Sequence, residues 1–158
     1  MIYLPLLIAV SKTAGTFSPN LKYMPPFDTK ERFGLWIKHN PFTLIPKPKN
    51  IVSQTWQDED GDDVFIPSTI YHEPYEIEIE FIYYNFDEMA NIRINEFLKE
   101  IEGKWLKVYD SYTKIGRQGL YMIECTEDPH FKRSENDYVE FSVKFKVNDP
   151  DTNITLAI

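Results

Sequence analysis

The clearest pattern along the chain is a strict alternation of apolar and charged residues near its middle. In YEIEIEFIYY, residues 75–84, apolar side chains occupy every second position and three glutamates stand between them. A period of two predicts a β-strand with one face buried and the other facing solvent or a partner. The stretch DYVEFSVKFKVND, residues 137–149, repeats the pattern. We therefore expect two long strands with one buried face each.

A different period follows the first of these strands. In DEMANIRINEFLKEIEG, residues 87–103, the apolar residues recur at spacings of three and four. That spacing places them on one stripe of an α-helix. Asp87 is a suitable N-cap and Gly103 a suitable C-terminal stop. The pattern predicts one amphipathic helix over residues 87–102.

Shorter β-prone runs predict the remaining strands, at residues 1–10, 33–38, 51–57, 63–67, 104–110 and 119–127. Strands joined by short links and interrupted by one helix favour antiparallel pairing. The predicted fold class is therefore α+β: a mostly antiparallel β-sandwich, or barrel-like sheet, with one packed α-helix. The length of 158 residues fits a single domain covering 1–158.

Prolines concentrate ahead of the alternating region. Six of the eleven fall between residues 19 and 48. Proline removes a backbone donor and fixes an extended conformation, so it disfavours ladder positions inside a sheet. We expect a proline-rich arm or long loop over about residues 11–50. Its aromatic residues Tyr23, Phe27 and Phe42 are candidate subunit contacts.

An acidic run lies between two β-prone segments. The stretch WQDEDGDDVF, residues 56–65, places five acids at positions 58–63 around a single glycine. In a calcium loop the weak candidate ligands would be Asp58, Asp60 and Asp62. However, Asp63 stands where such a loop has its glycine and Thr69 where it has its closing glutamate. Asp-Gly in this context favours a hairpin turn, so we expect an exposed hairpin tip and no metal.

The polar face of the first alternating strand carries Glu76, Glu78 and Glu80, about 7 Å apart at each step. Like charges at such spacing repel unless water or cations surround them. Three interpretations stay open. The face is solvated, it meets Lys144 or Lys146 of a neighbouring copy, or it forms the wall of an acidic channel.

Composition changes the picture mainly by what it disfavours. A net charge of −8, from 25 acids and 17 bases, disfavours specific nucleic-acid binding, because phosphate contacts need a basic face. The apolar residues 1–10 lack a basic leader and are too few to span a bilayer, so no membrane anchor is expected.

The residues that could carry catalysis or bind a metal do not form a recognisable motif. His39, His72 and His130 lie far apart and at no metal-binding spacing. Cys125 has no nucleophile motif around it. We expect no catalytic residues and no cofactor, and hence a protein that is not an enzyme.

Four stretches within residues 59–158 resemble tail-region proteins of phages and prophages from Bacteroides-type bacteria. They are EDGDDVFIP, YEIEIEFIY, VYDSYTKIGRQGLY and FSVKFKVNDPDTNITL. The run from Tyr109 to Tyr121 is the most specific of them. More distantly, the layout is similar to the tail-tube and distal-tail fold, whose members assemble into rings.

The resemblance implies a structural virion protein of a phage tail, neck or head-to-tail connector, assembled in the host cytoplasm. Its partners would be its own copies, in a ring of six-fold symmetry or a multiple of it, and adjacent tail or neck proteins. The ring would line or join the DNA channel, where an acidic wall would not hold phosphates. Families of this kind have no catalytic residues to carry over.

The alternative function is that of a carbohydrate-binding β-sandwich. Aromatic faces stack on sugars, and Trp36, Trp56 and Trp105 are the candidates. Trp36 lies in an apolar run and Trp105 opens a strand after the helix, which favours core positions for both.

Overall fold

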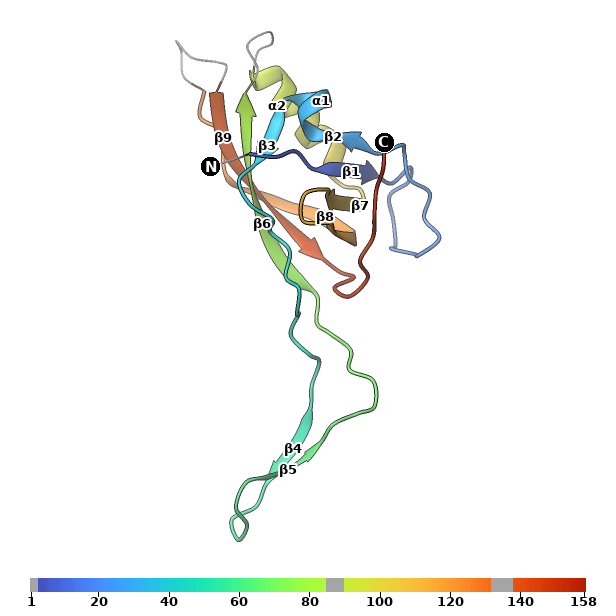
Figure 1. Ribbon diagram of the computed structural model, residues 1–158, viewed down its shortest axis with the longest axis vertical. Coiled ribbons are helices and arrows are strands. Elements are labelled where there is room, and N and C mark those ends of the chain that lie inside the picture. Colours follow the sequence, from blue (N-terminus) through green and yellow to red (C-terminus); the bar gives the residue numbers. More distant parts are fainter. Residues whose placement is uncertain (1–2, 85–89, 132–137) are drawn as a thin grey trace.

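The computed structural model describes residues 3–84, 90–131 and 138–158. Most strands form one seven-stranded sheet in the order β2-β1-β7-β8-β9-β6-β3, and β4 and β5 form a separate pair (Figure 1). The elements are β1 Leu7–Val10, β2 Phe27–Asp28, α1 Thr29–Phe33, β3 Leu35–Ile37, β4 Val52–Thr55, β5 Asp62–Phe65, β6 Tyr75–Tyr84, α2 Ala90–Ile101, β7 Leu106–Asp110, β8 Ile115–Glu127 and β9 Tyr138–Val147. Neighbouring strands pair antiparallel, which confirms the predicted α+β class.

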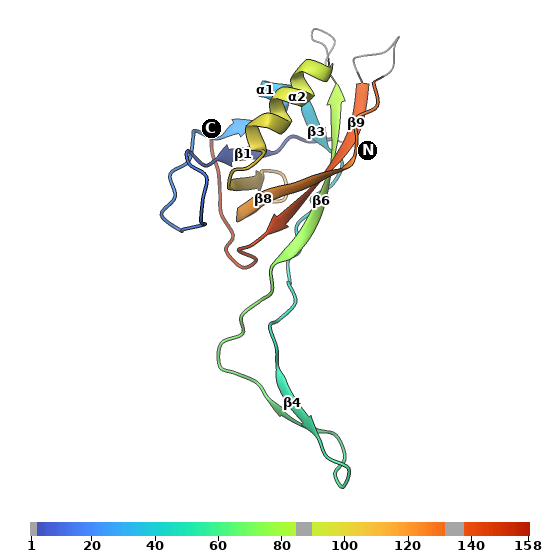
Figure 2. The ribbon, with the colours of Figure 1, turned by 180° about the vertical axis from the view of Figure 1, so that it is seen from behind.

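The two alternating strands are neighbours in the sheet, between β8 and the edge strand β3. β6 and β9 pair from Tyr75 opposite Val147 to Tyr84 opposite Tyr138, and their apolar positions face the core as predicted. Helix α2 lies diagonally across this part of the sheet (Figure 2). Its Phe97 is fully buried, and the centroid of its ring lies 5.1 Å from that of Phe81. Burying a side chain of this size contributes about 1.5–3 kcal/mol.

The predicted helix is confirmed over Ala90–Ile101. Gly103, at φ 72°, follows its last turn, as expected of a C-terminal stop. Asp87, the predicted N-cap, lies outside the described residues. No helix in the described ranges has the length and apolar character needed to cross a membrane.

The two ends of the sheet approach each other through the N-terminal segment. Leu4 exchanges two backbone hydrogen bonds with Ile37 of β3, at N···O distances of 3.3 and 2.9 Å. Leu4 precedes β1, whereas β3 is the strand at the far edge. The bridge therefore curls the sheet towards a barrel and covers part of an otherwise open edge.

Residues 27–37 lie within the stretch predicted as an arm or long loop, but they pack on the body, and β3 matches the strand predicted at 33–38. Asp28 caps the short helix α1, because its carboxylate accepts from the N–H groups of Lys30 and Glu31 at 2.8 and 3.1 Å. The buried Thr29 hydroxyl accepts from Leu6 N–H and donates to the Leu35 carbonyl. These contacts fix α1 and β3 on the sheet, so the projecting part of the chain begins only after β3.

The projecting part of the chain is residues 43–74, which we call the arm. It leaves the body after β3, carries the β4–β5 hairpin at its far end and returns into β6 (Figure 1). Between body and hairpin, its limbs are joined by backbone hydrogen bonds from Lys49 to Tyr71 at 2.7 Å and from Glu73 to Lys47 at 2.8 Å. The prolines at 46 and 48 lie on the outgoing limb, where an extended backbone suits them.

Candidate functional site

The acidic run forms the tip of the arm, as the sequence predicts. β4 and β5 pair from Val52 opposite Phe65 to Thr55 opposite Asp62, and residues 56–61 connect them. Gly61 has φ 74°, a left-handed conformation in which glycine has no steric cost. The Thr55 hydroxyl donates to Asp62 at 2.7 Å.

The tip does not gather its carboxylates around a common point. The indole N–H of Trp56 donates to Asp63 at 2.8 Å, so this carboxylate, like Asp62, already has a neutral donor. Within the described ranges, no three acidic, histidine or cysteine side chains converge as metal ligands would. Of the weak candidate ligands, Asp58 and Asp60 lie on the turn and Asp62 begins β5, and they form no cation site among the described residues.

The arm exposes apolar side chains along both limbs. Their exposed fractions are Leu44 71%, Ile45 84%, Ile51 43%, Val52 67%, Trp56 45%, Val64 53%, Phe65 68%, Ile66 67% and Tyr71 68%. An isolated two-stranded hairpin is at best marginally stable in water. Contiguous exposed apolar surface marks an interaction site in soluble proteins. The exposed apolar residues of the arm therefore make it a candidate interaction surface.

The outgoing limb is held at its base by the turn between β7 and β8. The Asn40 side-chain amide donates to the Asp110 carboxylate at 3.1 Å and to the Thr113 hydroxyl at 2.7 Å. Its carbonyl oxygen accepts from Phe42 N–H at 2.8 Å. Phe42 then inserts its ring into the core, at 9% exposure. These contacts fix the direction in which the chain leaves the body.

Arg117 links the base of the arm to the C-terminal segment, residues 148–158. Together with Asn40 and Asp110, it forms what we call the clamp. The guanidinium is buried and donates to the Thr43 carbonyl at 3.3 Å and to the Asn153 side-chain oxygen at 3.1 Å. Gly116 N–H donates to the same Asn153 oxygen at 2.9 Å. On the returning limb, His72 Nδ1 lies 2.7 Å from Asp151 Oδ1. The β7–β8 hairpin and the C-terminal segment together hold both limbs.

The glutamate row on β6 meets cations of its own chain. Glu76 lies 3.2 Å from Lys144 Nζ, and Glu80 lies 3.8 Å from Lys38 Nζ. Glu78 accepts from the Thr126 hydroxyl at 2.7 Å. The pKa of Lys144 is raised, first by its hydrogen bond to Glu76. Water reaches and screens these pairs, so they neutralise the face more than they stabilise the fold.

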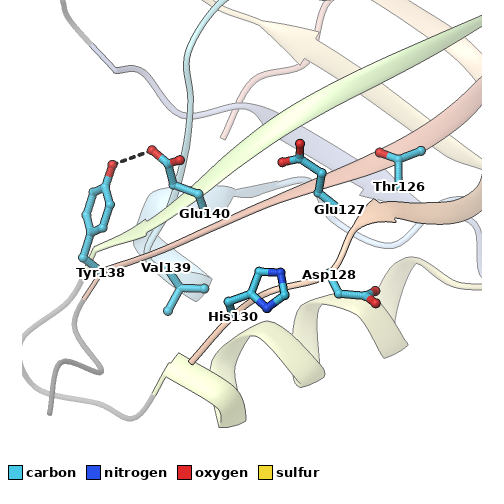
Figure 3. Close-up of a pocket in the computed structure, with 7 residues that line it drawn as sticks. All are labelled: Thr126, Glu127, Asp128, His130, Tyr138, Val139 and Glu140. Atoms are coloured by element: carbon cyan, nitrogen blue, oxygen red, sulfur yellow. Dashed lines mark hydrogen bonds between the residues drawn. The ribbon is translucent and has the colours of Figure 1, made fainter. Parts of the chain in front are cut away.

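A hollow of about 630 Å³ lies where β8 ends and β9 begins (Figure 3). It is lined by Thr126, Glu127, Asp128, His130, Tyr138, Val139 and Glu140. The Tyr138 hydroxyl donates to Glu140 at 2.6 Å, which raises the pKa of Tyr138 to about 12 and lowers that of Glu140. Among the described residues that line the hollow, no hydroxyl or thiol is hydrogen-bonded to His130. The hollow thus offers carboxylates and a phenol, without a paired nucleophile and base.

Comparison with solved structures shows a likeness of fold. No protein-family model and no curated protein matches the chain. Among solved structures, its fold is similar to that of the Dit protein of phage SPP1, described as a paradigm of the hub adsorption apparatus in phages that infect Gram-positive bacteria. The TM-score is 0.54 at 11% identity, over 92% of this chain and 50% of the Dit chain. The likeness is one of fold, and this chain spans about half the length of Dit.

The three predicted subunit-contact residues are not on the arm as the structure defines it. Phe27 and Phe42 belong to the core, at 8% and 9% exposure, so neither ring is free to anchor a partner. Tyr23 is half-buried, and the Lys107 ammonium lies 4.4 Å above its ring. Aromatic residues in a proline-rich stretch can pack on the body as well as on a partner, as Phe27 and Phe42 do, and a subunit contact of Tyr23 stays a prediction.

Two of the predicted tryptophan positions also need correction. Trp36 and Trp105 are half-buried rather than part of the core. Trp105 packs between Phe17 and Tyr121 on the outer surface of β7 and β8, and its indole N–H donates to the Gly15 carbonyl. Trp56 is exposed at the tip of the arm.

Sequence reasoning missed the clamp residues Asn40, Asp110 and Arg117. The stretch that contains Asp110 and Arg117 was singled out only by resemblance. A local signal existed, since an aspartate followed three residues later by threonine is typical of a tight polar turn. Nothing local indicates that Arg117 contacts Thr43 and Asn153, which are distant in sequence.

Proposed function

We propose that this protein is a structural component of a phage tail that assembles into a ring through its arm. The observation that carries the proposal is the arm itself: a long hairpin with exposed apolar residues, no core of its own and a clamped base. The fold likeness to a phage hub protein supports the tail assignment. The narrower placement in phages of Bacteroides-type bacteria rests on the sequence resemblance.

The arm suits a contact between neighbouring copies. An extended limb such as residues 44–55 reaches about 40 Å, at roughly 3.3 Å per residue. Burying Trp56, Phe65 and Ile66 against a neighbour contributes about 1.5–3 kcal/mol each. Because the arm of one copy meets the body of the next, the contact is heterologous, and heterologous contacts close into rings when the rotation permits.

The remaining features follow from this assignment. We infer a ring of six copies or a multiple of six, whose further partners are adjacent tail or neck proteins. The protein then resides in the virion and assembles in the host cytoplasm. A ring that lines or joins the DNA channel would benefit from the net charge of −8, because like charge does not hold phosphates.

Excision of the hairpin tests the proposal. Residues 50–70 are removed and Lys49 is joined to Tyr71 through Asn-Gly, a dipeptide suited to a tight hairpin turn. The limbs are already hydrogen-bonded at this level, so the base stays intact. Light scattering and electron microscopy should show rings of the full-length protein and only monomers of the variant that lacks residues 50–70.

The two possible failures have different meanings. A full-length protein that stays monomeric, even alongside its tail-region neighbours, contradicts the ring. An excised protein that assembles as well as the full-length one leaves the ring standing and removes the role of the arm. Unchanged melting of the excised monomer, within about 2 °C, excludes misfolding as the cause of lost assembly.

Carbohydrate binding is a second candidate, favoured by one observation. An apolar hollow of about 390 Å³ is lined by Tyr3, Trp36, Ile82, Tyr84 and Tyr138. Exposed aromatic rings around such a hollow can stack on sugars. Tryptophan fluorescence titrated with oligosaccharides tests this function, with Trp36→Ala as the matched variant. A saturable change that Trp36→Ala abolishes would favour binding, and an unchanged spectrum would reject it.

A further inference from the structure

The body carries lysines at matching positions of three neighbouring segments. Ser11 pairs with Tyr23 on one side and donates its N–H to the Trp105 carbonyl at 2.9 Å on the other. The adjacent residues in register form what we call the lysine row: Lys12, Lys22 and Lys104. A backbone hydrogen bond of 2.9 Å from Lys12 to Lys22 confirms the register between the first two.

The lysine row is electrostatically uncompensated within one copy. Directly opposed residues of antiparallel segments share a face, with Cβ atoms about 4.5–5.5 Å apart, and like charges there repel. Among the described residues, no carboxylate lies within ion-pair distance of any of these three amines. Lys12 and Lys22 are also exposed. Such a row in a chain of net charge −8 is suited to an anionic partner.

A hollow of about 220 Å³ lies beside the row. Its lining joins the apolar residues Val10, Met24, Pro25 and Phe27 with the ion pair of Arg32 and Glu100. Met24 N–H donates to the Val10 carbonyl at 2.8 Å, two positions along the segments that carry Lys12 and Lys22. Met24 is 48% exposed. This surface therefore places the lysine row next to a recess of mixed apolar and charged lining.

The tip of the arm has the complementary properties. Five carboxylates at positions 58–63 lie between Trp56 and Phe65, whose side chains are 45% and 68% exposed. The tip cannot reach the lysine row of its own copy, because it lies at the far end of the longest axis of the molecule, away from β1 and β2 (Figure 1). The opposite charges of the tip and the row can therefore meet between two copies but not within one.

We propose that the acidic arm tip of one copy docks on the lysine row of the next copy. This inference rests on the proposed ring and names the surface that receives the arm. The contact joins different surfaces of two identical chains, as ring closure requires. It also relieves the repulsion among the lysines, since the acidic tip supplies counter-charges.

Charge reversal tests the pairing in the full chain. Both K12E/K22E and D58K/D60K should abolish assembly under conditions in which the unmodified protein forms rings. The variant with all four substitutions keeps the net charge of −8 and should assemble again, because its basic tip meets an acidic row. K99E/K114E, which changes two exposed lysines elsewhere by the same charge, is the matched control and should assemble normally.

Cross-linking gives an independent measurement that does not need stable rings. A carbodiimide joins carboxylates to amines that touch, and mixing isotope-labelled with unlabelled chains identifies links between copies. Links from the acidic tip to Lys12, Lys22 or Lys104 between different copies are expected. Their absence, or full assembly of K12E/K22E, overturns the proposal whether or not the ring exists.

The outcomes separate this inference from the proposed function. Rings that tolerate K12E/K22E but not hairpin excision leave the arm as a contact and reject the lysine row as its receptor. Rings that tolerate both changes reject the arm as well. Duplex DNA is the other anion that such a row could bind. An anisotropy signal with labelled DNA that K12E/K22E removes would overturn the assignment to a second copy.

Discussion

At the scale of single residues, Gly116 seats the C-terminal segment against the β7–β8 hairpin. A Cβ at this position would overlap the carbonyl oxygen of Ile154 and lie 2.9 Å from the Tyr109 ring. Gly116→Ala should therefore push the C-terminal segment off the body and reduce the free energy of unfolding by about 1–3 kcal/mol. Denaturant unfolding monitored by circular dichroism measures this loss.

Gly61→Ala is the comparison for that prediction. A Cβ at Gly61 would meet no other atom within 4 Å, so this substitution costs only the left-handed conformation, about 1–2 kcal/mol, within the arm. The global unfolding transition should not move. Equal destabilisation by the two substitutions would contradict the role of Gly116 as the seat of the C-terminal segment.

Tyr138 has a raised pKa that follows from a specific hydrogen bond. Its hydroxyl donates to Glu140, and this bond raises the pKa of Tyr138 to about 12. A raised pKa in the folded state means that the bond stabilises fully below the unfolded value of about 10 and is lost as pH rises through 12. NMR titration of isotope-labelled tyrosine should show Tyr138 ionising in this high range, and Glu140→Gln should bring its pKa down. A Tyr138 signal that titrates near 10 in the unmodified protein would contradict the bond.

At the scale of elements, we expect the acidic tip of the β4–β5 hairpin to fold without a bound metal ion. Asp62 and Asp63 accept from neutral side-chain donors of the same hairpin, and no formed cation site is present among the described residues. We expect neither millimolar calcium nor a chelator to change the thermal midpoint or the tryptophan fluorescence, since an ion that does not bind cannot shift the equilibrium. A saturable fluorescence change that Asp60→Asn weakens would show a real calcium site.

The elements differ in how well their sequences predict them, for physical reasons. β6, β9 and α2 are long enough for a period of 2 or 3.6 to repeat, because each buries one continuous face. β2 has two residues and α1 has five, which is too short for any period to show. Both depend on tertiary contacts such as the buried Thr29 hydroxyl, which bonds Leu6 and Leu35.

The sequence predicts the parts of the candidate site that are formed by residues close together in the chain, and not the contacts between distant segments. The hairpin tip follows from Asp-Gly between β-prone segments, and the pairing of Thr55 with Asp62 confirms it. The prolines indicate that much of residues 11–50 lies outside a sheet ladder. They do not distinguish a loop that packs on the body from a limb that projects from it. Lys12 and Lys104 are neighbours only through the pairing around Ser11, which no local pattern encodes.

At the scale of the whole molecule, the structure divides into a body with a continuous core and an arm without one. The body gathers its buried residues from all parts of the sheet and from α2, whereas the described strands of the arm are exposed throughout. Local opening needs little free energy where few apolar contacts are broken. The arm should therefore open and be cleaved far sooner than the body.

Limited proteolysis with chymotrypsin tests this division. We expect the first cuts in the monomer next to Trp56 or Phe65, with the two fragments remaining associated, because β3 and β6 stay paired in the sheet. Tyr112 is an internal control: it is 75% exposed, but the Asp110 carboxylate fixes its turn by accepting from its N–H at 3.0 Å. In assembled rings the cuts in the arm should slow at least tenfold while cleavage elsewhere is unchanged, since a docked arm must first dissociate. Equal cleavage of the arm in monomers and rings would mean that the ring is built without it.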